Sequence, residues 1–306
     1  MTDRIAAAAD PHSVVGLDGS ESSMPAMRWA IAHADLFGPP EPMLVWHYPA
    51  AMWSSPLAGP DTLSVETMQS AAEKALAAAL DELDPADHLP PVVRHGDPAT
   101  QLVEQATDAG LLVVGTRGLG AVRGRLLGSV GCYCADHAPV PVVIVPAARE
   151  GAPHGPGRRV VVGVDGSDNA DAALRWALMH SRDDDEIIAV GAWETVASLG
   201  TRDTGEEVEL LEKLAVETVD EVAHRVTGEL GIAGSRVERR HERGDPRSVL
   251  RRLAYEADLV VVGARGRSGL PHLFLGSTAS TLAHRPISPL AIVPAGDRSP
   301  DADPES

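Results

Sequence analysis

Lysine and cysteine, which supply many nucleophiles and metal ligands, are almost absent from this chain. Its 306 residues include two cysteines and only two lysines, Lys74 and Lys213. Neither lysine follows a glycine-rich loop, so the sequence contains no Walker A phosphate-binding loop. Cys132 and Cys134 are two positions apart on an expected helix and point to different faces, so a disulfide or a metal pair between them is unnatural. We expect both to be buried structural thiols.

Long apolar runs and an excess of positive charge are also absent. No run approaches the roughly 20 apolar residues of a membrane span, and the apolar patch Ile5–Ala9 is too short for a signal peptide. The formal net charge of −18 opposes binding to nucleic acid or to anionic membranes, because their phosphate groups are repelled at long range. We therefore expect a cytoplasmic protein with no nucleic-acid partner and no membrane partner.

The sequence is built from one unit that occurs twice. VVGLDGS at Val14–Ser20 returns as VVGVDGS at Val161–Ser167, and Gly96–Pro98 returns at Gly244–Pro246. A period of this length indicates duplicated domains rather than a solenoid of short repeats. The join between the two copies is rich in glycine and proline, as linkers often are. The predicted organisation is a first domain over 1–146, a linker over 147–157, a second domain over 158–294 and a flexible tail over 295–306.

Within each unit, short aliphatic runs alternate with segments that favour helices. In the first unit the runs expected to be strands are Ser13–Leu17, Met43–Trp46, Pro91–His95, Leu111–Val114 and Val142–Val145. Strands that alternate with helices form parallel crossovers, and the helices then cover both faces of the sheet. The predicted fold is therefore α/β: two tandem copies of a five-stranded, mainly parallel, open sheet with helices on both faces, of the Rossmann-like type.

Two glycine-rich segments, Gly115–Ser129 and Gly263–Ser277, follow the fourth strand of each unit. Both contain a glycine, two residues, a second glycine, nine residues and then Gly-Ser. A loop between a strand and a helix start gathers backbone N–H groups around a phosphate, and glycines let the main chain approach the anion closely. Tight turns alone would also explain the glycines, but the same spacing in two units that otherwise diverge favours phosphate binding.

An aspartate follows the first strand of each unit, Asp18 in the first and Asp165 in the second. Ligands of such sheets bind outside the carboxyl ends of the strands, so each aspartate is expected to line the same crevice as the glycine-rich segment of its unit. Two roles are open for these carboxylates: a hydrogen bond to a ribose hydroxyl, or stabilisation of an Asp-Gly turn. Two roles are also open for Trp46 and Trp193, the last residues of the second strand in their units. Each either forms one side of an adenine pocket or packs in the core.

The start of each unit, the glycine-rich spacing and a PVVIVP-like last strand resemble the universal stress protein family in its tandem, ATP-binding form. The resemblance implies one ATP in each unit, with Gly16 and Asp18, or Gly163 and Asp165, on the adenosine side. It also implies that the two units pair through their last strands as a pseudo-dimer within the chain, and it leaves a homodimer of whole chains open. Around the phosphates it implies Gly115, Gly118, Gly128 and Ser129 in the first unit, and Gly263, Gly266, Gly276 and Ser277 in the second. Apart from the resemblance, local arginines can set a positive field in a small pocket of an acidic protein, so Arg117, Arg125, Arg265 and Arg267 are further candidates for ligand contact. Val130 and Thr278, which follow the two serines, complete the candidate binding residues.

The expected function is that of an ATP-binding stress-response or dormancy regulator, which binds ATP with or without Mg²⁺ and acts on a protein partner that the sequence does not identify. A regulator fits better than an enzyme, because phosphoryl transfer needs placed cations and a positioned nucleophile. No serine elbow and no His/Cys/Asp cluster with catalytic or metal spacing recurs. Two alternatives stay open: a slow ATPase or adenylyl-transferring enzyme at the same site, and a module for another adenine ligand such as cyclic AMP.

Overall fold

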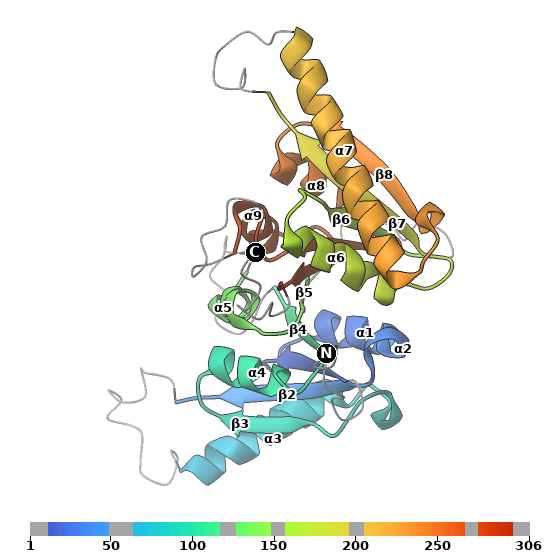
Figure 1. The fold of residues 1–306 in the computed structure, drawn as a ribbon. Coiled ribbons are helices and arrows are strands. Elements are labelled where there is room, and N and C mark those ends of the chain that lie inside the picture. The colour runs from blue at the N-terminus through green and yellow to red at the C-terminus, as the bar shows by residue number, and fades with distance from the viewer. Residues whose placement is uncertain are drawn as a thin grey trace, which may run out of the picture. The chain divides into compact units, whose positions relative to one another are not determined.

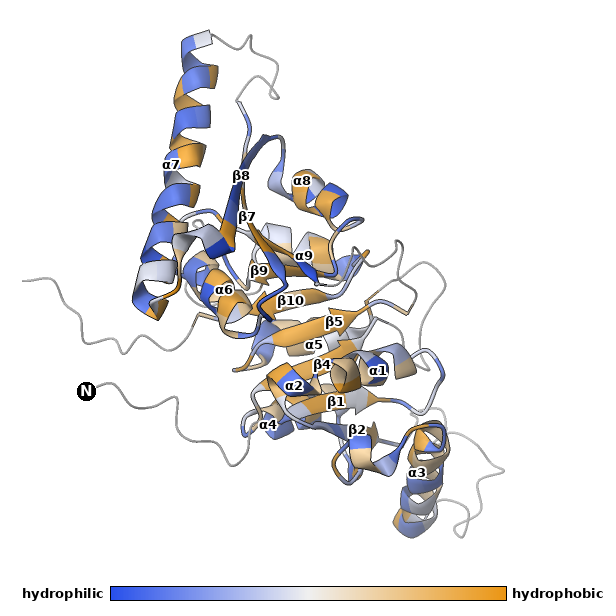
Figure 2. Ribbon diagram, turned by 90° about the vertical axis from the view of Figure 1, so that its right-hand side faces the viewer, coloured by the Kyte–Doolittle hydropathy of each residue, from blue (hydrophilic) through white to orange (hydrophobic). Residues whose placement is uncertain are grey.

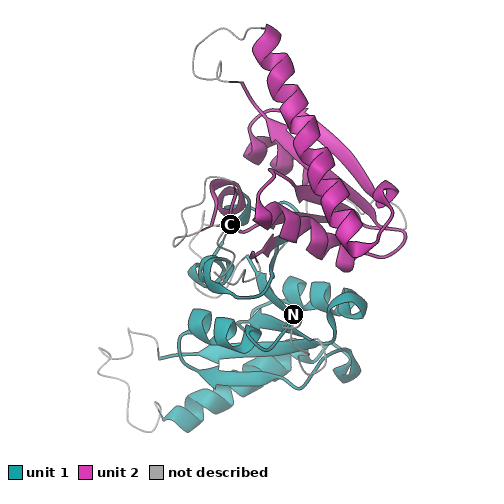
Figure 3. Ribbon diagram, viewed as in Figure 1, with its two compact units in different colours: residues 1–152, 282–291 teal, residues 153–281, 292–306 magenta. Residues whose placement is uncertain are grey.

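The computed structural model describes residues 12–48, 64–116, 127–147, 157–195, 205–266 and 275–295 (Figure 1). By its internal contacts the chain divides into two compact units (Figure 3). The first comprises Met1–Ala152 with Leu282–Ala291, and the second comprises Pro153–Thr281 with Ile292–Ser306. Residues 282–291 thus group with the first unit, although the sequence repeat assigns them to the second copy. The domain boundaries drawn from the repeat stay a prediction.

The first unit alternates strands with helices, as its sequence predicts. Its elements are β1 (Ser13–Leu17), α1 (Met24–Ala32), α2 (Ala34–Phe37), β2 (Pro40–Trp46), α3 (Val65–Leu80), the 3₁₀ turn Pro85–Asp87, β3 (Val92–His95), α4 (Pro98–Ala106), β4 (Leu111–Gly115), α5 (Ser129–His137) and β5 (Val142–Val145). The strands pair in parallel in the order β3-β2-β1-β4-β5. Because parallel crossovers are right-handed, the reversal of direction after β3 puts α1 to α3 on one face and α4 and α5 on the other.

The second sequence repeat, which we call the second unit from here on, has the same arrangement, although its residues 282–291 group by contacts with the first compact unit. Its elements are β6 (Arg159–Gly163), α6 (Asp168–Met179), β7 (Glu186–Trp193), α7 (Gly205–Leu230), the 3₁₀ turn Gly234–Arg236, β8 (Val237–Arg243), α8 (Pro246–Leu253), β9 (Leu259–Gly263), α9 (Ser277–His284) and β10 (Leu290–Val293). The strand order is β10-β9-β6-β7-β8, and β6 pairs in parallel with both β7 and β9. The α/β class with two tandem, mainly parallel sheets is therefore confirmed. In the part of the chain that the structure describes, no helix combines the length and the apolar composition of a membrane span.

The central strands form the core of each unit, and Figure 2 colours them as hydrophobic. Every residue of β5 is buried, and so is every residue of β4 except its last. Helices cover both faces, so these strands are aliphatic at consecutive positions rather than at alternate ones. The edge strand β8 differs, because only Val237 is buried and charged residues follow it. Charge of this kind keeps an open sheet edge from pairing unspecifically.

A buried ion pair joins the start of β6 to the connection between α6 and β7. Arg158 Nη2 lies 2.5 Å from Asp185 Oδ2, and the two side chains are only 11% and 1% exposed. The carboxylate also accepts hydrogen bonds from the backbone N–H groups of Arg158 (2.9 Å) and Arg182 (2.8 Å). Burial alone raises the pKa of Asp185, but the hydrogen bonds from Arg158 and Arg182 outweigh it, and the pKa lies below its ordinary value. Asp185 is therefore ionised at neutral pH. It holds Arg158, just before β6, against the connection between α6 and β7.

Asp97 caps the N-terminus of α4, and its removal gives a first testable prediction. Its Oδ1 accepts hydrogen bonds from the Thr100 backbone N–H and from Thr100 Oγ1, both at 2.9 Å. We expect Asp97→Ala to lower the free energy of unfolding by about 1 kcal/mol, the usual cost of losing an N-cap. Asp97→Asn keeps a capping oxygen and should retain most of that stability. Urea unfolding at neutral pH measures both, and an equal loss in the two variants would contradict the capping role.

Candidate functional site

The aspartates that follow β1 and β6 adopt the same local structure. Asp18 Oδ1 accepts hydrogen bonds from the Ser20 backbone N–H (3.0 Å) and from Ser20 Oγ (2.6 Å). Asp165 Oδ1 accepts the same two bonds from Ser167, again at 3.0 and 2.6 Å. The glycine after each aspartate has a positive φ, 79° in the first unit and 82° in the second, which favours glycine. Each aspartate therefore stabilises its Asp-Gly turn, one of the two roles expected from the sequence.

The described ends of the first glycine-rich segment lie close to each other. Gly115 ends β4, and the buried Thr116 after it donates its backbone N–H to the Val145 carbonyl at 3.1 Å. At the other end Gly128 precedes α5. A Cβ placed on Gly131, in the first turn of α5, would lie 3.9 Å from the Gly115 carbonyl oxygen. The start of α5 therefore faces the carboxyl end of β4.

The second glycine-rich segment closes on itself. Gly263 ends β9, and the Gly276 backbone N–H donates to the Ala264 carbonyl oxygen at 2.8 Å. A Cβ placed on Gly276 would lie 3.3 Å from both Arg265 Cα and Gly266 N. The glycines on either side of the nine-residue interval are thus neighbours in space. This closure leaves little room for a side chain at Gly276.

Asp165 meets the second glycine-rich segment. A Cβ placed on Gly266 would lie 2.6 Å from Asp165 Oδ2, too close for any residue but glycine without a shift of the carboxylate. The end of β6 and the loop after β9 therefore form one surface at the carboxyl end of the sheet. In the second unit the aspartate and the glycines predicted to share a crevice are brought together.

Two helices begin where the glycine-rich segments end. α5 begins at Ser129, which is exposed, and Gly128 before it provides no side-chain cap; Val130 lies in the same first turn. α9 begins at Ser277, with Thr278 as its second residue. The first-turn N–H groups of a helix have no intrahelical acceptor and carry the positive end of the helix dipole, so they attract anions. In each unit a helix thus begins beside the glycines, with first-turn N–H groups that have no intrahelical acceptor.

The comparison with protein families identifies both halves of the chain. The model described as "Universal stress protein family" matches residues 12–146 and again residues 157–294. The chain belongs to the universal stress protein family. The tandem organisation and the family that the sequence motifs suggest are therefore confirmed.

Two known members of the family match nearly the whole chain, and a third matches about half of it. A universal stress protein of Mycolicibacterium smegmatis is 31% identical over 290 residues, which cover 92% of this chain and 96% of the relative. The crystal structure of a universal stress protein from Archaeoglobus fulgidus has the same fold, with a TM-score of 0.61 at 21% identity, and covers 93% of this chain and 98% of its own. A universal stress protein solved in complex with cAMP is 30% identical, with a TM-score of 0.30, and covers 46% of this chain and 99% of its own.

The glycines of β1 and β6 each have a packing role. A Cβ on Gly16 would lie 2.9 Å from Leu102 Cδ1, and a Cβ on Gly163 would lie 2.9 Å from Leu250 Cδ1. Leu102 and Leu250 are buried on α4 and α8. These glycines therefore let a leucine of the covering helix approach the strand. Their place on the adenosine side stays a prediction of the family resemblance.

Trp46 is packed and covered, which favours the core role over a wall for adenine. It is 7% exposed, and its indole N–H donates to Gln69 Oε1 at 2.7 Å. Its ring centroid lies 4.4 Å from that of His95 and 5.6 Å from that of Tyr48. In the second unit Trp193 instead lies beneath the guanidinium of Arg243, 5.7 Å from its ring centroid.

Of the two cysteines expected to be buried, Cys134 is buried and Cys132 is half-buried on α5, and neither forms a disulfide. Burial, with a smaller contribution from the charge of Asp97, raises the pKa of Cys134 to about 12. The thiolate is therefore absent at neutral pH. Among the described residues no group of histidines, cysteines and carboxylates is arranged to hold a metal ion.

Several predicted phosphate contacts lie outside the described residues, namely Arg117, Gly118, Arg125 and Arg267. Arg265 is described and exposed at the rim of the second loop. Asn169 is a neighbour that the sequence analysis missed. A Cβ on Gly263 would lie 2.6 Å from Asn169 Cβ and 2.7 Å from its backbone C and O, so the first turn of α6 rests directly on the end of β9. The repeat gave no signal, because the matching residue of the first unit is Ser22.

Proposed function

We propose that this universal stress protein is an ATP-binding regulator of a stress or dormancy response, with one nucleotide in each unit. The observation that carries the proposal is the closure of the second glycine-rich segment, where the Gly276 N–H binds the Ala264 carbonyl and Gly266 abuts Asp165. These contacts bring the start of α9 and the Asp165 carboxylate to one end of the sheet. Such an arrangement suits a phosphate chain joined to a ribose.

The residues have separate roles in this proposal. The N–H groups at the start of α9, with Ser277 and Thr278, hold the phosphates, while Arg265 supplies positive charge at the rim. Asp165 accepts a hydrogen bond from a ribose hydroxyl in addition to its turn. Gly115, Gly128, Ser129, Val130 and Asp18 have the same roles in the first unit. Mg²⁺ would enter with the phosphates, which supply oxygen ligands of the kind it prefers.

ATP acts in this proposal as a regulator rather than as a substrate. A bound ligand changes a protein only in so far as it favours one conformation over another. ATP bridges the end of the first strand and the glycine-rich segment, so it favours the conformation in which both are ordered, and a cytoplasmic protein partner recognises that form. Pairing of the two units through β5 and β10 stays a prediction. Turnover well above background, lost in Asp18 and Asp165 variants, would favour the enzyme instead.

A binding measurement tests the proposal. Equilibrium dialysis of the purified chain against ATP, AMP and cyclic AMP, each with and without Mg²⁺, should give two bound ATP molecules per chain and weaker binding of the other two. Nucleotide extracted from the freshly purified protein identifies what it holds in the cell. No binding at millimolar ATP would refute the proposal, and tighter binding of cyclic AMP would replace ATP as the ligand.

A further inference from the structure

Two leucines in the N-terminal half of α7 are left exposed by their own unit. Leu210 and Leu214 are 58% and 48% exposed, and they lie one turn apart on one side of the helix. The buried residues of α7 begin only at Val219, and a Cβ on Gly191 of β7 would lie 2.5 Å from Val219 Cγ2. Val219 follows Leu210 by nine residues, which is about two and a half turns. Leu210 therefore points away from the sheet that Val219 contacts.

The first unit shows that the fold does not require these leucines. A Cβ on Gly19 would lie 3.4 Å from Ala75 Cβ of α3, and a Cβ on Gly166 would lie 3.1 Å from Thr218 Cγ2 of α7, so Ala75 and Thr218 hold equivalent positions. Counting back along both helices, the first unit has a threonine and an alanine, both exposed, in place of Leu210 and Leu214. These matching residues are Thr67 and Ala71.

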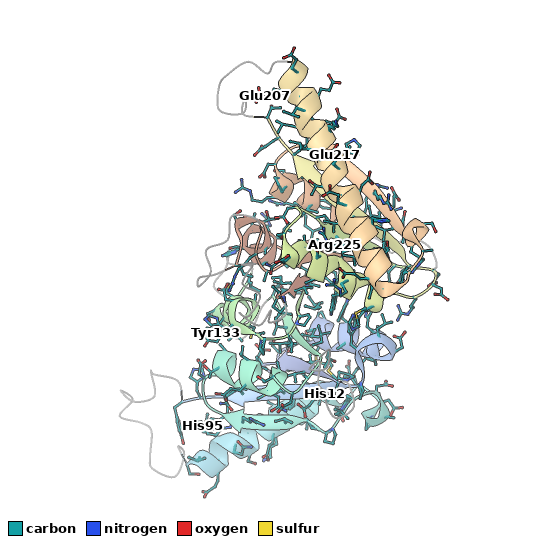
Figure 4. The ribbon with its side chains drawn as sticks, in the orientation of Figure 1. His12, His95, Tyr133, Glu207, Glu217 and Arg225 are labelled. Atoms are coloured by element: carbon teal, nitrogen blue, oxygen red, sulfur yellow. The ribbon has the colours of Figure 1, made fainter. Side chains whose placement is uncertain are left out.

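Exposed charged residues lie beside the two leucines. The helical period of 3.6 residues places three glutamates and one lysine on the same side of α7 as Leu210, and all four are exposed. Figure 4 labels Glu217, which is one of them. We call the resulting surface the leucine face, and it comprises Glu206, Leu210, Lys213, Leu214, Glu217 and Glu221.

The charge of this helix also differs between the two units. Residues 207–221 contain one basic and six acidic residues, a balance of 1 − 6 = −5. The matching residues 64–78 contain one basic and two acidic residues, a balance of 1 − 2 = −1. The basic residue of α7 is Lys213, which pairs with Glu217 at 3.7 Å. The second unit has thus gained apolar surface and negative charge together on the outside of one helix.

We propose that the leucine face binds a basic amphipathic helix of another protein. Apolar side chains one turn apart receive the apolar side of a second helix, as in other complexes that recognise helices. The glutamates beside the leucines favour a partner with arginine or lysine next to its apolar residues. A second leucine face fits less well because it brings like charges together, and a nucleic acid or an anionic membrane is repelled for the same reason. The binding needs no nucleotide, so it holds or fails separately from the proposed function.

The first test measures the binding of a designed helix. The probe is a peptide of about 18 residues, five turns of helix, with leucine along one side, arginine along the other and a blocked N-terminus. We expect Leu210→Thr/Leu214→Ala to raise its dissociation constant at least tenfold in fluorescence anisotropy, with unchanged circular dichroism of the chain. Met179→Thr is the control, because Met179 is 58% exposed in the same unit but lies at the end of α6. Equal affinity of the wild type and the leucine variant, or no binding to the wild type at ~1 mM probe, would overturn the proposal.

The second test changes the charge of the leucine face. Glu217→Gln/Glu221→Gln should weaken binding of the probe about fivefold, as the loss of two exposed charge pairs would. The control Glu66→Gln/Glu73→Gln removes the same number of charges from exposed positions of α3 and should leave the affinity unchanged. A probe with glutamate in place of arginine should not bind. An equal loss in the two variants would show that the probe responds only to the net charge of the chain, which contradicts the proposal.

The third test locates the bound helix through the rarity of lysine. Lys74 and Lys213 are the only two lysines of the sequence, and both are exposed. Because the arginine probe has no amine, an amine-reactive reagent with mass spectrometry compares the two directly. The probe should slow the modification of Lys213 and leave that of Lys74 unchanged. Equal rates for Lys213 with and without saturating probe would refute the assignment. So would a rate for Lys213 that falls with the concentration of the chain and does not respond to the probe, because a second copy would then cover the leucine face.

Discussion

Asp185→Ala is expected to lower the free energy of unfolding of the second unit by about 3–5 kcal/mol, the cost of leaving one partner of a buried ion pair alone. Arg158 would remain 11% exposed without its carboxylate, and the backbone N–H groups of Arg158 and Arg182 would lose their acceptor. Urea unfolding followed by tryptophan fluorescence measures the loss. A loss below about 1 kcal/mol, the level of an exposed pair, would show that the pair contributes little.

The neighbouring pair gives a matched control. Arg159 and Glu186 follow Arg158 and Asp185 directly in sequence, but Glu186 is 42% exposed. Glu186→Ala should therefore cost less than about 1 kcal/mol. The difference between the two variants isolates the effect of burial, since both remove a carboxylate where β7 begins.

The stability that Asp185 contributes should also depend on pH. Its pKa is lowered in the folded chain because its hydrogen bonds outweigh the effect of burial. A carboxylate of this kind contributes fully above its unfolded pKa of about 3.9 and loses its contribution as the pH falls through the folded value. The difference between the wild type and Asp185→Ala should thus be constant from neutral pH down to about pH 5 and shrink below about pH 4.

The sequence was sufficient for the fold because the signals that define it are local. Aliphatic runs and helical spacing placed all five strands of the first unit, and the repeat extended them to the second. The ends of the elements were less certain, since β2 begins at Pro40 rather than at Met43. Ends of elements depend on tertiary contacts, such as the backbone N–H of Leu89 that binds the Pro40 carbonyl, and no local pattern encodes these.

The candidate site was predictable only in part, because glycine is required for different reasons at different places. The sequence alone does not distinguish the reason for glycine at Gly16 and Gly163 from the reason at Gly266. In the structure, the missing side chain leaves room for a leucine at the first two positions and for a carboxylate at the third. Trp46 closes a strand near Asp18, but Gln69 and His95 cover it. Asn169 touches the site through the packing of α6 on β9. Such distinctions depend on which side of the sheet a Cβ points to and which helix lies there.

Gly263→Ala should abolish nucleotide binding in the second unit and leave it intact in the first. The added Cβ would lie 2.6–2.7 Å from Cβ, C and O of Asn169, and two of these atoms are backbone, which cannot move aside as a side chain can. The added methyl group can avoid this clash only if the end of β9 moves away from α6. That movement carries Arg265 and Gly266 away from Asp165 and opens the surface proposed to hold the phosphates.

Dialysis with ATP should therefore find one nucleotide per Gly263→Ala chain in place of two. Gly228→Ala is the control, because a Cβ there meets nothing within 4 Å, and it should bind two nucleotides as the wild type does. Trp176 is buried in the second unit, so the part of the tryptophan fluorescence that Trp176→Phe removes reports whether that unit is still folded. Two nucleotides bound with unchanged affinity in a folded Gly263→Ala chain would show that the ligand does not depend on the meeting of β9 with Asp165, and the second site would have to be sought elsewhere.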